Sequence, residues 1–375
     1  MTGRIFKRGC LAAAMILCVI VLAQLNRIEK TELYDTTGQT FERAEVLDIL
    51  EDNKTEHENA VGNQKVLLKI LTGEYKGEEL EAYSTPSYLF GADCKEGMRV
   101  IAIVSVSENE RTAVVYGIDR ALAVIFMVLV FCITVCLIGG KRGAASIAGL
   151  FVAVVCIVFV FLPLIYRGIS PIPAAVLVVA VTTVSTIFLV GGLTAKSIAA
   201  MCGTAGGVAA AGIYAWIFGE VTHISGFNVS EIEELVYIAG QTRIQVGGLL
   251  FAGILIAALG AVMDVGMSIA ATQQEVLEKK PELTARELFA SGMNVGKDMM
   301  GTMSNTLILA FAGGSINTLV CLYAYQYPVR QLMNMYSLGI EIMQGVSATM
   351  GVVMTVPLTS GVGAVLLTRA VRKRG

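Results

Sequence analysis

Long uninterrupted apolar runs constrain the fold of this chain more than any other feature. Several of them exceed 18 residues, a length that is typical of helices that cross a membrane. The chain has 375 residues, of which 55% are hydrophobic and only 15% are charged, whereas a soluble domain usually carries about 25% charged residues. We therefore expect a multi-pass membrane protein. A net charge of −2 without a basic patch gives no support to nucleic-acid binding.

The first apolar run covers residues 9–25 and follows three basic residues, Arg4, Lys7 and Arg8. A basic segment before a short apolar core resembles a signal peptide. No cleavage motif of small residues follows this run, so we expect residues 1–26 to form an uncleaved signal-anchor transmembrane helix. The positive-inside rule then puts the N-terminus in the cytoplasm.

Residues 27–118 are the only long polar segment, and their pattern predicts a β-rich domain. About five short runs of alternating apolar residues are separated by turn residues, at 41–50, 64–71, 78–84, 98–106 and 111–117. This spacing predicts a small antiparallel barrel or sandwich, similar in shape to an oligonucleotide-binding (OB) barrel. The mixed surface charge assigns no ligand to it. We expect this domain to be extracytoplasmic because it follows the first span.

Residues 119–375 predict a seven-helix transmembrane domain, which brings the total to about eight spans. The fold class expected is thus a membrane all-α helical bundle with a small β-rich domain after the first helix. Basic residues support cytoplasmic termini, because Lys141, Arg142, Lys196 and the tail residues Arg369 and Arg372 fall on the inner side. The predicted spans are 121–138, 144–166, 171–190, 198–218, 246–272, 299–325 and 338–368.

A charged segment at about 273–297 separates two of these spans and predicts a cytoplasmic amphipathic helix. Pro281 suits a first helical position, and apolar residues such as Leu283, Leu288 and Met293 form a stripe. We expect this helix to lie on the membrane surface and to set the angle between its neighbours.

Cysteine and histidine residues predict neither disulfides nor a metal site. Seven of the eight cysteines lie in apolar spans, as buried small apolar residues do. His57 and His223 are far apart in sequence and make no ligand pattern. We expect no cofactor and no metal.

Asp264 is an acid inside an apolar span, and such residues are functional-site candidates by default. Small residues surround it at helical spacing, including Gly260, Ala261 and Ser268, so we expect it to point into the bundle. A carboxylate at that depth must pair, bind a cation or stay protonated.

Asp298, Thr302 and Asn305 follow one another at helical spacing in the next span. One helix face thus carries a carboxylate, a hydroxyl and an amide, and these oxygen ligands suit a hard cation such as Na⁺ or a relayed proton. The alternative is structural: Asp298 caps its helix beside Lys297, while Thr302 and Asn305 bond across to another helix.

The last span carries Glu341 near its start and Pro357 in its second half. A helix broken at a proline frees backbone carbonyls, which is one way that transporters build a site at the membrane midplane. A helix that is merely kinked is the alternative. In the span at 198–218, the glycines among alanines favour close helix packing, with a glycine-lined permeation path as the alternative.

Three motifs in this region resemble the YibE/F-like family of bacterial membrane proteins. They are ALGAVMDVGMSIA at 258–270, GKDMMGTMSNTLILAFAGGS at 296–315, and VPLT at 356–359 together with the Glu341 region. The layout of one anchor, one outer segment and seven spans also fits. The resemblance implies a bacterial cell membrane but brings no established activity. A weaker resemblance, in architecture only, links the central spans to resistance–nodulation–division transporters.

We expect a secondary transporter or ion-coupled membrane protein that takes H⁺ or Na⁺ and a small solute. Its polar site is predicted to use Asp264, Ser268, Asp298, Thr302, Asn305 and Glu341. The alternative is a non-enzymatic assembly or sensor protein whose outer domain binds a partner. An enzyme is disfavoured because the chain has no HExxH motif, no paired GxGD-type aspartates and no Ser–His arrangement.

Overall fold

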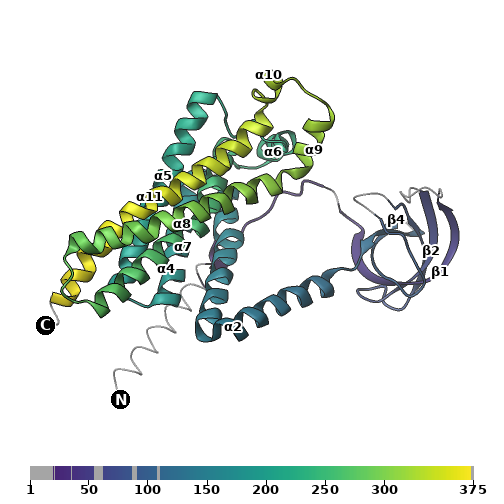
Figure 1. Cartoon of the computed structure of the whole chain (residues 1–375). Coiled ribbons are helices and arrows are strands. Elements are labelled where there is room, and N and C mark those ends of the chain that lie inside the picture. Colours follow the sequence, from purple (N-terminus) through teal and green to yellow (C-terminus); the bar gives the residue numbers. More distant parts are fainter. Residues whose placement is uncertain are drawn as a thin grey trace, which may run out of the picture. The chain divides into compact units, whose positions relative to one another are not determined.

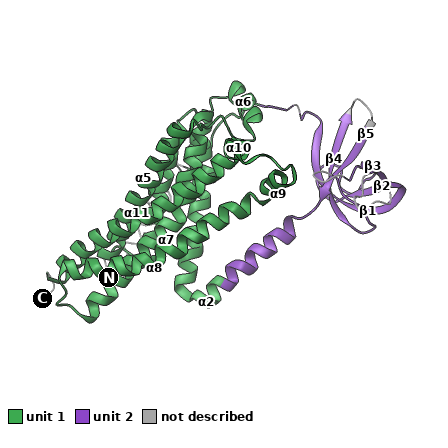
Figure 2. Cartoon of the chain, turned by 45° about the horizontal axis from the view of Figure 1, so that its top comes forward, with its two compact units in different colours: residues 1–31, 135–375 green, residues 32–134 purple. Residues whose placement is uncertain are grey.

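A computed structural model describes residues 20, 22–34, 36–54, 62–86, 91–107 and 110–372. The chain divides into two compact units, which Figure 2 shows in different colours. Unit 2 is Glu32–Thr134, and unit 1 combines Met1–Thr31 with Val135–Gly375.

Unit 2 contains a closed five-stranded barrel (Figure 1), which confirms the predicted β-rich domain. The strand order is β1-β2-β3-β5-β4, and β3 pairs with β5 in parallel while the other neighbours are antiparallel. This is the topology of an OB barrel. Its strands are β1 (Gln39–Lys54), β2 (Gly62–Ile70), β3 (Glu79–Ser84), β4 (Arg99–Ser107) and β5 (Glu110–Ile118).

Alternation of apolar and polar residues explains why these segments form strands. Val66, Leu68 and Ile70 of β2 are fully buried, whereas the residues between them face outward. On the outer side, Lys65 Nζ lies 2.7 Å from Glu81 Oε2, and this hydrogen bond raises the pKa of Lys65 above its ordinary value.

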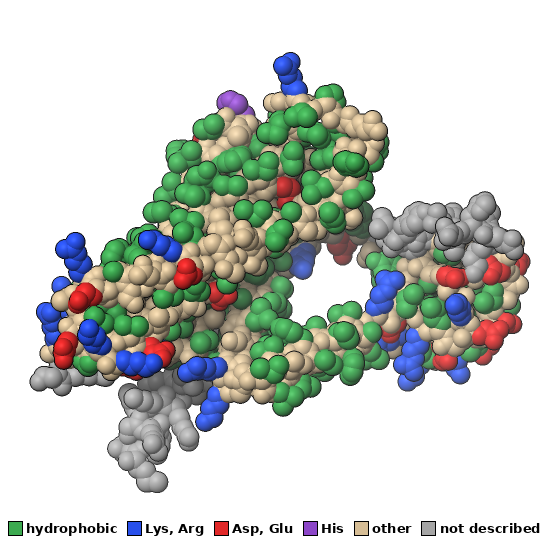
Figure 3. Space-filling view, in the orientation of Figure 1, with side chains coloured by type: hydrophobic (Ala, Val, Ile, Leu, Met, Phe, Trp, Pro, Cys, Tyr) green, Lys and Arg blue, Asp and Glu red, His purple; other side chains and the backbone are tan. Residues whose placement is uncertain are grey.

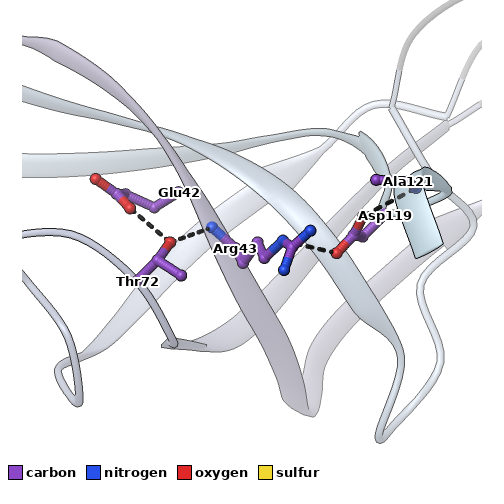
Figure 4. Close-up of polar contacts among 5 residues, drawn as sticks. All are labelled: Glu42, Arg43, Thr72, Asp119 and Ala121. Carbon is purple, nitrogen blue, oxygen red and sulfur yellow. Dashed lines mark hydrogen bonds and ion pairs between the residues drawn. The ribbon is translucent and has the colours of Figure 1, made fainter. Parts of the chain in front are cut away.

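Asp119 ties the end of the barrel to the first turn of α2 (Figure 4). Its Oδ2 atom lies 3.2 Å from Nε of Arg43 in β1, and its Oδ1 atom accepts from the backbone N–H of Ala121. The backbone N–H of Arg43 in turn donates to Thr72 Oγ1, whose hydroxyl donates to Glu42. The Asp119 carboxylate therefore accepts from the first N–H group of α2 and also forms an ion pair with a barrel strand.

Unit 1 is helical. It contains α2 only from Val135 onward, because the first part of this helix belongs to unit 2. Its described elements are α2 (Ala121–Cys156), the π-helical turn η1 (Ile157–Phe161), α3 (Leu162–Tyr166), α4 (Pro171–Gly191), α5 (Ala195–Thr222), α6 (Ile232–Gln241), the 3₁₀ turn η2 (Val246–Gly248), α7 (Leu249–Lys279), α8 (Ala285–Gly314), α9 (Ile316–Ala324), α10 (Val329–Leu332) and α11 (Tyr336–Arg372).

Within the described residues, five helical segments are long and apolar enough to cross a membrane, or six if α8 and α9 form one span bent by 63°. The expected number of eight is not confirmed. The predicted first span lies mostly outside the described residues. The predicted spans at 121–138 and 144–166 count together as one helical segment of 46 residues. The helix kinks between them at Gly140, whose φ of 53° and ψ of −132° are not helical.

The predicted separate amphipathic helix at 273–297 is replaced by the ends of two long helices. Residues up to Lys279 extend α7, and α8 begins at Ala285 after a short turn that contains Pro281. The apolar stripe has a different role from the one expected. Leu288 is fully buried, and its carbonyl accepts from the side chain of Gln273, so both helix ends pack onto the bundle.

Within unit 1, the end of the first apolar run contacts η1 and Arg167 through hydrogen bonds. Arg167 Nη2 donates to the carbonyl oxygens of Gln24 and Leu25, at 2.7 and 3.1 Å. The side chain of Asn26 donates to the carbonyl of Phe159 in η1. These bonds satisfy carbonyls at a helix end, where basic side chains are favourable.

Helices α5, α7 and α11 form the core, and glycines let their backbones approach. A Cβ atom on Gly207 of α5 would lie 1.9 Å from Thr355 Oγ1 of α11 and 2.7 Å from a methyl of Val262 in α7. This supports the packing interpretation of the glycine-rich span. Helix α11 continues through Pro357 rather than breaking there.

Candidate functional site

Asp264 lines a cavity of about 460 Å³ between α7, α4 and the second half of α2. We name it the Asp264 cavity; its lining also includes Ser146, Gly149, Leu150, Ala153, Ile157, Val178, Thr182, Thr186, Ile187, Val190, Ile256, Ala257, Leu259, Gly260, Met263 and Met267. The walls are mostly apolar, so the carboxylate is the dominant polar group in this space.

Two hydroxyl groups of α4 join Asp264 in this cavity. The Oγ1 atoms of Thr182 and Thr186 are buried, and among the described residues they have no hydrogen-bond partner. Unpaired buried hydroxyls are costly in protein interiors and require an explanation such as a water or an ion. Ser146 of α2 adds a third hydroxyl to the lining.

Small residues keep the Asp264 cavity open. A Cβ atom on Gly260, one turn before Asp264, would meet nothing within 4 Å. By contrast, a Cβ on Gly149 would lie 2.8 Å from a methyl of Thr186, so α2 and α4 touch at this point. The contact of α2 with α4 therefore borders the cavity, whereas Gly260 and the exposed side chain of Asp264 leave space beside α7.

A second cavity of about 500 Å³ lies next to the first and is strongly charged. We name it the charged vestibule; its lining is Arg142, Val190, Gly191, Lys196, Met267, Ala271, Gln274, Glu275 and Glu278. Glu275 pairs with Lys279 at 3.1 Å, and Glu278 accepts from Gln274 at 2.6 Å. Arg142 and Lys196 form no ion pair with any described residue.

Val190 and Met267 line both cavities and form the neck between them. The terminal methyl of Met267 packs beside Gly191, where a Cβ atom would lie 3.5 Å from it. Methionine is unbranched and flexible, so it can change rotamer in a narrow passage. The two cavities are thus neighbours that share Val190 and Met267 in their linings.

Asp298, Thr302 and Asn305 lie on the exposed face of α8 and do not reach the Asp264 cavity. Thr302 Oγ1 donates to the Asp298 carbonyl within the same helix, at 3.3 Å. Within the residues that the structure describes, no hydrogen bond or ion pair joins Asp298 to Asp264. Ser268 is half-buried, one turn after Asp264 and outside the cavity lining.

Glu341 lines a third cavity, of about 190 Å³, where α11 meets the bend between α8 and α9. Its neighbours there are mostly apolar, including Phe311 and Leu322. The structure therefore does not bring the six predicted site residues together: Asp264 and Glu341 line different cavities, three residues lie on the exposed face of α8, and Ser268 lines neither cavity.

The sequence analysis missed the threonines of α4 and the residues of the neck. Thr182 and Thr186 stand in a run of hydroxyl residues, TTVST at 182–186, inside an apolar span. That run was a visible signal, because hydroxyls four residues apart share one helix face. No comparable signal marks Val190 or Met267.

A carboxylate with hydroxyl oxygens in an apolar cavity can hold a proton, a hard cation or ordered water. In the described part of the chain, no group of three or more His, Cys, Asp and Glu side chains is placed to hold a metal ion.

The sequence was compared with known proteins. Residues 127–369 match the family described as YibE/F-like protein, and this region contains Asp264, the α4 threonines, the neck and the vestibule. No curated protein matches the chain, and no solved structure does either. The match covers well over half of the sequence, so this chain belongs to the YibE/F-like family.

Proposed function

We propose that this membrane protein is a secondary transporter or ion-coupled protein in which Asp264 accepts a proton or a hard cation such as Na⁺. The observation that carries the proposal is the Asp264 cavity, where a carboxylate meets the unpartnered hydroxyls of Thr182 and Thr186. Ionisable residues inside membrane spans usually serve ion or substrate pathways. The activity is not enzymatic in this proposal.

In this proposal, one aqueous route to Asp264, whose side chain is itself exposed, runs from the charged vestibule past Val190 and Met267. The vestibule residues Arg142, Glu275 and Glu278 are exposed, so water reaches that end of the route. A charged, solvent-accessible vestibule next to the mostly apolar Asp264 cavity is an arrangement suited to a gated pathway. The solute is small, because the Asp264 cavity measures about 460 Å³.

We further propose that the vestibule opens to the cytoplasm of a bacterial cell, and that both termini lie there. Charged side chains gather at one end of unit 1, around the ends of α7, α8 and α11 (Figure 3). The exposed basic residues at that end include Lys279, Arg286 and Arg369, which supports the assignment by the positive-inside rule. In this proposal, residues 27–118 are extracytoplasmic and the protein has about eight spans.

The test is ion movement in liposomes that contain the purified full-length protein. A dye reports internal pH or Na⁺ while a panel of small solutes is added. We expect a response with the wild-type protein and its loss with Asp264→Asn, which keeps the size of the side chain. The matched variant Asp298→Asn keeps the response, because Asp298 lies outside the Asp264 cavity. Size-exclusion profiles check that each variant is folded.

Three outcomes would count against this proposal in different ways. No wild-type response over the whole panel would leave transport without support. Equal loss in both variants would favour the single joined site predicted from sequence. Poor folding of Asp264→Asn, with normal folding of Asp298→Asn, would favour a structural role for Asp264.

A second candidate function is assembly or sensing through the barrel of unit 2. An apolar row crosses four strands on its outer surface, because Phe41 pairs with Ile103, Ile103 with Val114, and Val114 with Tyr83. Phe41 and Tyr83 are more than half exposed, and exposed apolar patches often mark interaction sites. A photo-crosslinker at Val114, with Asp48 as control position, tests this role in intact cells. A discrete adduct at Val114 alone supports it, and the same pattern at both positions contradicts it.

A further inference from the structure

Helix α8 has one packed face and one polar face that no other described residue of unit 1 covers. Leu288, Gly292 and Gly296 are buried against the bundle, and Gly296 is close enough to Val356 of α11 that a Cβ atom would lie 2.3 Å away. The opposite face is exposed, and we name it the α8 polar face; it consists of Asn294, Asp298, Gly301, Thr302 and Asn305.

The polar groups of this face lack partners from other helices. Thr302 bonds only to the carbonyl of Asp298, four residues before it in the same helix. In the described part of the chain, the Asp298 carboxylate and the Asn305 amide make no side-chain hydrogen bond. A Cβ atom on Gly301 would meet nothing within 4 Å, so the surface there is also open.

A bare polar face is unfavourable on a helix that crosses a membrane. Helices α8 and α9 together are long and apolar enough to form a bent span. Carboxylate and amide groups facing lipid are costly, and in membrane proteins they usually face other helices. A polar surface from elsewhere is therefore needed to cover the α8 polar face.

Two further apolar runs of the sequence carry few polar groups that could form such a surface. The apolar residues 9–25 contain one amide, Gln24, and no hydroxyl. In the first half of α2, the hydroxyl of Thr134 already donates to the carbonyl of Val130, at 2.8 Å. Neither run offers several polar groups at helical spacing.

We infer that the α8 polar face is the interface between two copies of this chain. Two copies in one membrane share an orientation, and closed two-fold pairs are the commonest assemblies of soluble oligomers. Around such an axis, Asn305 meets the same residue of the second copy, and an amide both donates and accepts. Asp298 lies two helical turns before Asn305 on the same face, so the two carboxylates approach each other, and the exposed Lys297 beside each one supplies a compensating positive charge.

Disulfide cross-linking of the full-length protein in its native membrane tests this interface. In a background without the natural cysteines, Thr302→Cys places one thiol on the α8 polar face. Val184→Cys places one on the exposed surface of α4, where Val184 is 54% exposed, as a matched control. On mild oxidation, we expect a covalent dimer with Thr302→Cys and none with Val184→Cys. Equal yields at both positions, or no dimer at either, would overturn the inference.

A second measurement does not depend on cysteine chemistry. Energy transfer between labelled copies is followed while lipid dilutes the protein. We expect Asn305→Leu to weaken dimerisation about three- to thirty-fold, which is the range for one hydrogen bond between membrane helices. Asn334→Leu removes an exposed amide that bonds only to the carbonyl of Arg330, and it should leave dimerisation unchanged. Unaltered transfer with Asn305→Leu would contradict the inference, whatever the transport assay shows.

Discussion

Gly203 of α5 lies against Thr359 of α11 so closely that a Cβ atom on Gly203 would stand 1.7 Å from Thr359 Oγ1. Both residues are buried, so the two helices cannot move apart without disturbing the core. The pair lies beside α7, because a Cβ on Gly266 would contact the hydroxyls of Thr204 and Thr359 at 3.2 and 3.5 Å. The helix that carries Asp264 is thus held by backbone-to-backbone packing.

Gly203→Ala is expected to destabilise the bundle. The added methyl must push α5 and α11 apart, and overpacking of this kind costs about 1–3 kcal/mol. Thermal unfolding in detergent, followed by size-exclusion chromatography, measures the change. Gly253→Ala is the matched control in α7, because a Cβ there would meet nothing within 4 Å. If both variants melt at the same temperature, the close approach of α5 and α11 is wrong.

Gln273→Leu is expected to loosen the contact of α7 with α8 and α11. The side chain of Gln273 is fully buried, and its Nε2 atom donates to the carbonyls of Leu288 and Ser360, at 3.0 and 2.9 Å. Gln273→Leu removes these two buried hydrogen bonds, each worth about 0.5–1.5 kcal/mol. Chemical denaturation in detergent measures this loss. Gln274→Leu affects a bond to Glu278 within one helix and should cost much less.

Thr284→Ala is expected to fray the first turn of α8. Thr284 Oγ1 accepts from the backbone N–H of Glu287 at 3.3 Å, while a Glu287 carboxylate oxygen accepts from the backbone N–H of Thr284 at 2.9 Å. Removing such a capping box costs about 0.5–2 kcal/mol of helix stability. Hydrogen exchange of the amides of Glu287 and Leu288, which donate to Thr284, should become faster. Thr284→Ser keeps the oxygen and should restore protection; equal exchange in all three proteins would show that the cap contributes nothing.

Much of the fold follows from the sequence pattern, because buried strands show alternating apolar residues and membrane helices show long apolar runs. The alternating residues of β2 and β4 predicted the barrel, and the long apolar runs predicted the membrane-capable helices. The segment 273–297 was misread because its charged residues suggested a surface helix. Its apolar positions, Leu288 and Gly292, in fact continue the packed face of α8.

The candidate site was less predictable, because the rotation of each helix about its own axis determines which side chains line a cavity. The sequence predicts that Asp264 points into the bundle, and it leaves Asp298 either in a polar site or at a helix cap beside Lys297. Both carboxylates are exposed, but Asp264 lines a cavity with the α4 threonines, whereas Asp298 does not line it. Composition alone cannot separate a polar face that lines a cavity from one that meets another subunit, since both bury polar groups away from lipid.

Met267→Trp is expected to block the route between the charged vestibule and Asp264. The methionine lines both cavities, so a bulky indole in its place fills the neck without removing any charge. We expect the ion response in liposomes to fall at least about tenfold, because the closed route leaves Asp264 without access to water from the vestibule side.

Carbodiimide labelling provides a readout for Met267→Trp that needs no transport substrate. A water-soluble carbodiimide added on the vestibule side should modify Asp264 in the wild-type protein and much less in this variant, as mass spectrometry of the α7 peptide measures. Leu193→Trp is the control, because Leu193 is 78% exposed and lines neither cavity. Full labelling of Asp264 in Met267→Trp would mean that the carboxylate is reached by another path, and the neck would then have no gating role.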